Sequence, residues 1–89
     1  MHMGLNIFLS DNKNAEAIVV QLADEVEKHN SNSEAKDRKY GVVHNCSYTI
    51  GENKIEFRID VGSAGIVFIK KLLKLLTKFS EVEEVIVDL

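Results

Sequence analysis

The order in which hydrophobic patterns follow one another most restricts the fold of this chain. Apolar and polar side chains alternate in a strand, whereas apolar residues recur every three or four positions in a helix. The predicted elements are a strand at residues 5–10, a helix at 14–29, strands at 40–50 and 54–61, a helix at 64–79 and a strand at 82–89. The polar stretch at 30–39 is expected to be a loop.

Two features predict that these elements form one sheet with an open face. Residues 51–53, Gly-Glu-Asn, separate the two middle strands, and glycine and asparagine tolerate the positive φ of a tight hairpin. In the next strand Glu56, Arg58 and Asp60 share the side opposite the apolar residues, and burying three charges under helices would be costly. We therefore predict an α+β, ferredoxin-like βαββαβ sandwich with one four-stranded antiparallel sheet and two helices on one face.

The length of 89 residues predicts a single domain that spans residues 1–89. Apolar residues make up 45% and charged residues 28%, a composition typical of globular rather than disordered proteins. A domain of this size has one core and no room for a deep pocket, so we expect its function on the surface. The predicted core residues are Leu5, Ile7, Leu22, Val26, Phe57, Ile59, Leu73, Leu76 and Val87.

Charge and cysteine content argue against several classes of partner and cofactor. A net charge of −3 gives no positive field for nucleic acid, and Phe8 alone cannot form the aromatic platform of an RNA-recognition domain. The one cysteine, Cys46, excludes an internal disulfide and a cysteine-rich zinc site. No signal peptide or membrane-spanning pattern is visible. We expect a cytoplasmic protein with no cofactor, no metal, and neither a nucleic-acid nor a membrane partner.

Two groups of residues come nearest to a catalytic or metal-binding arrangement. His44 and Cys46 are two positions apart on one strand and so share a face, as a thiolate–imidazole pair would require. A metal site would need further ligands, which the sequence does not place beside them. Glu56 and Asp60 are separated by Arg58, which favours a surface ion network over an acid–base pair. We therefore expect no enzymatic activity.

A glycine-containing turn precedes the second helix. Gly62, Ser63, Ala64 and Gly65 could bring backbone N–H groups and a hydroxyl to an anion at the positive end of the helix. The lysine of a phosphate loop and the spacing of a dinucleotide fingerprint are both missing. A tight turn with Ser63 as N-cap explains the same residues. Anion or nucleotide binding at this turn is the alternative function.

The second helix has a basic face opposite its apolar face. The basic residues are Lys70, Lys71, Lys74 and Lys78. In isolation such a helix resembles one that binds anionic lipid or an acidic partner. The first helix is rich in acidic residues, so we interpret the lysines as the solvated face of a core helix that complements its neighbour.

A strand, a short glycine–serine turn, an amphipathic helix and a final strand follow one another in the second half. The segments concerned are residues 59–65 (Ile-Asp-Val-Gly-Ser-Ala-Gly), the leucine-rich helix and residues 85–87 (Val-Ile-Val). This arrangement resembles the effector-associated adaptor modules of bacterial conflict systems. Such modules are adaptors without catalysis, so the resemblance implies protein–protein recruitment.

The leading prediction is a small, non-enzymatic protein–protein interaction or adaptor module that associates with itself. Phe8 and Ile86 are the apolar residues at outward positions of the first and last strands, which are neighbours in a ferredoxin-like sheet. A two-fold dimer could bury both and pair Arg58 with a carboxylate of the second copy. The predicted interface residues are Phe8, Ile86, Arg58, Glu56 and Asp60. The strand edge with His44 and Cys46, or a different protein as partner, are the other possibilities.

Overall fold

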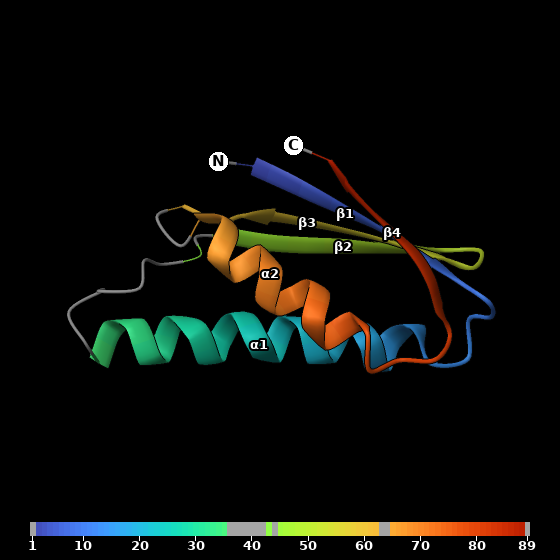
Figure 1. Cartoon of the computed structure of the whole chain (residues 1–89), viewed down its shortest axis with the longest axis horizontal. Coiled ribbons are helices and arrows are strands. Elements are labelled where there is room, and N and C mark those ends of the chain that lie inside the picture. The colour runs from blue at the N-terminus through green and yellow to red at the C-terminus, as the bar shows by residue number, and fades with distance from the viewer. Residues whose placement is uncertain (1, 36–42, 44, 63–64, 89) are drawn as a thin grey trace.

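Two helices and four strands follow one another in the described residues, in the predicted order. The computed structural model of the chain describes residues 2–35, 43, 45–62 and 65–88. Both helices lie on one face of the sheet, and the other face is open (Figure 1). The elements are β1 (His2–Leu9), α1 (Ala15–Ala35), β2 (Asn45–Gly51), β3 (Lys54–Asp60), α2 (Gly65–Leu76) and β4 (Val82–Asp88).

The four strands form one antiparallel sheet in the order β2-β3-β1-β4. β1 is a central strand, because Leu5 pairs with Phe57 of β3 on one side and with Val87 of β4 on the other. Within the described part of the chain, β2 pairs with β3 alone and β4 with β1 alone, so these two strands are the edges. The topology confirms the predicted α+β, ferredoxin-like arrangement.

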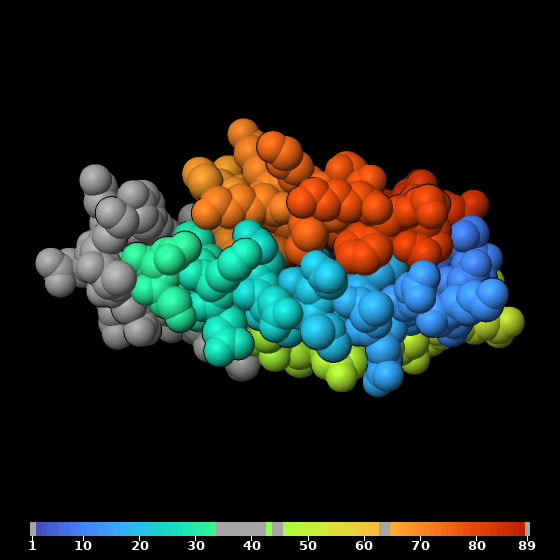
Figure 2. Space-filling model, turned by 90° about the horizontal axis from the view of Figure 1, so that it is seen from below, coloured from blue at the N-terminus to red at the C-terminus, as the bar shows by residue number. Residues whose placement is uncertain are grey.

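The helices cover the sheet from one side. Seen from that side, α1 and α2 lie next to each other across the molecule (Figure 2). α1 contacts β2, β3 and α2. Glu25 of α1, Lys71 and Lys74 of α2, and Lys78, which follows α2, line a shallow groove between the helices. Acidic and basic side chains of the two helices therefore meet at their shared groove.

The core lies between the sheet and the helices, and most of the predicted core residues are buried in it. Those that are buried are Leu5, Ile7, Leu22, Val26, Phe57, Ile59 and Leu76. Leu73 is partly buried and packs against the core. Val87 is 37% exposed, so its prediction as a core residue is wrong. It lies on an edge strand and has a neighbouring strand on one side only, which leaves its side chain less covered than that of Leu5.

α1 is longer than the sequence pattern indicates. It continues to Ala35, so the loop expected at 30–39 is wrong for its first six residues. The Asn30 side chain anchors this extension, because its Nδ2 donates to the carbonyl oxygen of Val43 (2.9 Å) and its Oδ1 accepts from the Val43 N–H (2.8 Å). A contact between distant residues thus overrides the weak helix propensity of a serine- and asparagine-rich stretch.

The hairpin between β2 and β3 has the predicted tight turn. Asn53 has a φ of 55°, in the left-handed region that asparagine tolerates better than most residues. The Asn12 side chain donates to the carbonyl oxygen of the last β2 residue (2.9 Å) and accepts from the Asn53 N–H, which fastens the turn to the segment between β1 and α1. Of the strand predicted at 40–50, residues 40–42 and His44 lie outside the described part of the chain.

Candidate protein interface

The open face of the sheet carries all five residues that the sequence predicted for an interface. Buried residues such as Leu5 and Phe57 are odd-numbered and face the helices, so the even-numbered side chains of β1 and β3 lie on the open face, together with Glu84, Ile86 and Asp88 of β4. The predicted residues there are Phe8, Ile86, Arg58, Glu56 and Asp60. Two successive rows across the sheet are Glu56, Asn6 and Ile86, then Lys54, Phe8 and Glu84.

Phe8 and Ile86 are diagonal neighbours on this face, but they differ in exposure. In the pairing of β1 with β4, Phe8 lies opposite Glu84 and Asn6 lies opposite Ile86. The Phe8 ring is half-buried, and the Lys54 Nζ lies 5.6 Å from its centroid in a cation–π contact. Ile86 is 48% exposed. Ile86 therefore contributes the larger exposed apolar surface, and Lys54 is a member of this surface that sequence reasoning missed.

Arg58 crosses the sheet beside a glycine. Its Nη1 lies 3.8 Å from the position that a Cβ would take at Gly4, and the Asp88 Cβ lies 3.6 Å from that position on the other side. The Arg58 Nη2 is 3.9 Å from Oε1 of Glu56 on the same strand. The arginine side chain is 65% exposed and the glutamate side chain 42%. This pair forms an accessible, charged border next to the apolar residues.

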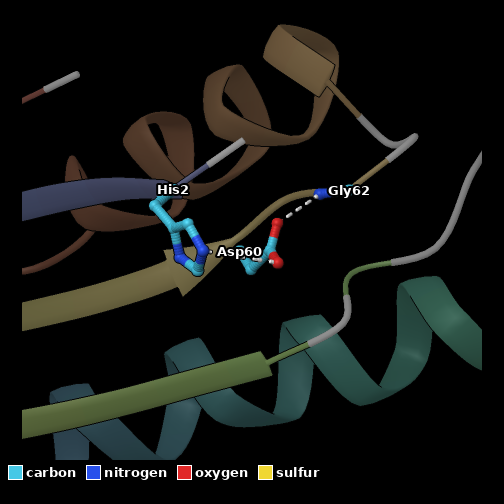
Figure 3. A network of polar contacts seen from close by, with 3 residues as sticks. All are labelled: His2, Asp60 and Gly62. Atoms are coloured by element: carbon cyan, nitrogen blue, oxygen red, sulfur yellow. Dashed lines mark hydrogen bonds and ion pairs between the residues drawn. The ribbon is translucent and has the colours of Figure 1, made fainter.

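Asp60 ends β3 and holds the chain as it turns toward α2 (Figure 3). Its Oδ1 accepts a hydrogen bond from the Gly62 N–H at 3.1 Å, and its Oδ2 lies 3.9 Å from Nε2 of His2. The Gly62 hydrogen bond is the main cause that lowers the pKa of Asp60 below its usual value of 3.8. Of the five predicted interface residues, Asp60 is therefore the one most clearly engaged within the fold.

The glycine-containing turn is described at its two ends, whereas Ser63 and Ala64 lie outside the described residues. Gly62 and Gly65 have φ values of 51° and 66°, in the region that favours glycine. The Gly62 N–H already donates to the Asp60 carboxylate, which also places a negative charge beside the turn. This N–H is not free to bind an external anion, which weakens the support for the alternative function.

Apolar residues gather around the outer side of β4, and of these only Ile86 was predicted as an interface residue from the sequence. Leu73 lines a groove together with Val85 of β4. Val87 and Ile86 are exposed on the two opposite faces of the strand. We refer to Leu73, Val85, Ile86 and Val87 together as the β4 rim.

The sequence does hold a signal for the β4 rim. Residues 85–87 are three apolar residues in a row, and a strand turns successive side chains to opposite faces. When one face of the sheet is open, at least one of the three must therefore point to solvent.

The remaining candidate residues do not form a reactive centre in the described residues. Cys46 is an exposed thiol on β2. Its predicted partner His44 lies outside the described part of the chain. Among the residues that are described, His, Cys, Asp and Glu side chains do not gather in groups of three that could hold a metal ion.

No family model, curated protein or solved structure matches the chain. Neither helix of the described residues combines the length and the apolarity needed to cross a membrane. Arguments about function therefore depend on the chemistry of the surface.

Proposed function

We propose that this domain is a small, non-enzymatic protein–protein interaction or adaptor module that associates with itself. The observation that carries the proposal is the β4 rim, where exposed apolar side chains lie on both sides of an edge strand. Single exposed apolar residues are normal on soluble proteins. A strand edge with unpaired backbone groups and apolar side chains on both faces gains free energy when another chain covers it.

The open face adds a polar border to this apolar surface. Glu56 lies in the same row of the sheet as Ile86, and Arg58 is its neighbour along β3. Protein interfaces commonly have an apolar centre and a polar rim. The arrangement supports Arg58, Glu56 and Ile86 as interface residues more strongly than Asp60, whose carboxylate is bonded to the Gly62 backbone.

An adaptor role agrees with the resemblance of the second half to effector-associated modules of bacterial conflict systems. In that role the domain brings proteins together and performs no reaction. A single exposed thiol, Cys46, suits the reducing environment of the cytoplasm, where we place the module.

Light scattering coupled to gel filtration, over a series of concentrations, tests self-association. We expect the wild-type chain to dimerise as concentration rises, and Ile86→Glu to shift it to monomer because a further negative charge then has to be desolvated at an already acidic contact. Val20→Glu is the matched control, because Val20 is 57% exposed on α1, away from the β4 rim. A wild-type chain that stays monomeric at its highest soluble concentration contradicts self-association.

The alternative, anion or nucleotide binding at the Gly62–Gly65 turn, leads to a different measurement. Because Asp60 occupies the Gly62 N–H, we expect inorganic phosphate and nucleotides to leave the melting temperature unchanged. A rise in melting temperature that grows with phosphate concentration and is lost at high ionic strength would support the alternative.

A further inference from the structure

At the outer edge of β4 are backbone groups that none of the described strands uses. In an antiparallel strand, the N–H and C=O of one residue point to the same side, and successive residues point to opposite sides. The Leu9 N–H donates to the carbonyl oxygen of Asn53 on the β3 side, so the even-numbered residues of β1 bond toward β4. Their partners in β4 are also even-numbered. Val85 and Val87 therefore direct their N–H and C=O groups to the free edge.

The two edges of the sheet differ in what surrounds these free backbone groups. On β2, the exposed side chains next to Tyr48 are Ser47 and Thr49, which are polar. On β4, Ile86 is exposed on the open face and Val87 on the helical side. Apolar area is what an added strand would bury, so β4 is the better edge for a partner.

The acidic residues of β4 restrict how a second copy could pair with it. If a two-fold axis passes through Glu84, the two copies of this glutamate lie opposite each other. If the axis passes through Ile86, Glu84 faces Asp88 of the second copy. If it passes through Val85, Glu84 faces Ile86 and Asp88 faces Val82, so no two carboxylates are opposed. Like charges directly opposite each other destabilise a strand pair, which favours the third register.

We propose that two copies of this chain join antiparallel along β4 about a two-fold axis at Val85, so that their sheets become one continuous sheet. This inference deepens the proposed self-association and rests on it. On the open face, the two copies of Ile86 are then diagonal neighbours. On the helical side, Val87 is diagonal to Val85 of the second copy. The irregular register between β1 and β4 involves Val82, outside the centre of this pairing.

Cross-linking through single cysteines tests the register. In a Cys46→Ser background, Glu84→Cys, Val85→Cys and Ile86→Cys each place a thiol on the axis of one of the three registers. Opposed residues of a hydrogen-bonded pair have Cα atoms about 5.5 Å apart, within the range of a disulfide. We expect Val85→Cys to give a cross-linked dimer fastest under mild oxidation, with Val20→Cys as the control for random collision. Faster cross-linking at residue 84 or 86 overturns the register.

A proline substitution tests the edge itself. Val85→Pro removes an N–H that points away from β1, so the monomer should keep its circular dichroism, whereas Ile86→Pro removes an N–H bonded to β1 and should destabilise it. We expect Val85→Pro to be monomeric by light scattering. If Val85→Pro folds and still forms a dimer, the pairing along β4 is overturned. Self-association itself is then retained, but through another surface. If Val85→Pro does not fold, the cysteine variants decide. The edge pairing is then overturned when Val85→Cys forms the cross-linked dimer no faster than Val20→Cys does. A monomeric wild type overturns both proposals.

Discussion

Phe57 is 1% exposed and belongs to the central part of the sheet, where β3 pairs with both β1 and β2. We expect Phe57→Ala to lower the free energy of unfolding by about 3–5 kcal/mol, because a filled core site is left with a cavity. Denaturant titration measures this loss. Val67→Ala, at a residue that is 66% exposed on α2, should change it by less than about 0.5 kcal/mol. A similarly small loss for Phe57→Ala would contradict the assignment of the Phe57 side chain to the core.

Asp60 makes the stability of the fold depend on pH. Its pKa is lowered in the folded state, mainly by the Gly62 N–H, so the carboxylate stabilises the fold above its unfolded pKa of about 3.8. This contribution is lost as pH falls through the lower, folded value. We expect Asp60→Asn to be less stable than wild type at neutral pH and the difference to shrink below pH 3.8. Thermal melts of the two proteins at neutral pH and below pH 3.8 measure this difference in stability. A difference that does not shrink at the lower pH would contradict a stabilising role of the Asp60 carboxylate.

The elements differ in how far the sequence alone predicts them, because some depend on local patterns and others on distant contacts. The alternation in β3 and the Gly-Glu-Asn turn are local patterns. The sequence predicted both the tight hairpin and which side chains of β3 face the core. The end of α1 depends on the contact between Asn30 and Val43, which no local pattern reports. Likewise, the three apolar residues 85–87 predict a strand, but their exposure follows from the edge position of β4 in the sheet.

The contact at the end of α1 can be tested by removing one side chain. Asn30→Ala should lower the free energy of unfolding by about 1–3 kcal/mol, because the part-buried N–H and C=O of Val43 both lose their partner. Asn32→Ala is the matched control on the same helix, since Asn32 is exposed. Denaturant titration, followed by circular dichroism, compares the two variants. Equal effects would show that the Asn30 amide does not anchor the helix.

The molecule as a whole is acidic, and this affects how two copies meet. Its net charge is −3, and β4 alone carries Glu83, Glu84 and Asp88. Pairing along β4 brings these carboxylates of both copies near one seam even when none are directly opposed. Added salt screens such repulsion. We therefore expect the dimer to become tighter as sodium chloride rises, measured by sedimentation equilibrium. Weakening with salt would instead point to attraction between Arg58 and a carboxylate of the second copy.

The place of β1 in the sheet also determines when the fold can form. β1 comes first in the chain, yet one of its two neighbouring strands is the last, and Gly4 pairs with Asp88. The β2–β3 hairpin can close early because its strands are adjacent in sequence, but the sheet is complete only once β4 has been synthesised and has paired with β1. Such long-range pairing slows folding. Until β4 arrives, β1 keeps an open edge, and this interval is when the nascent chain is most exposed to mispairing with its neighbours.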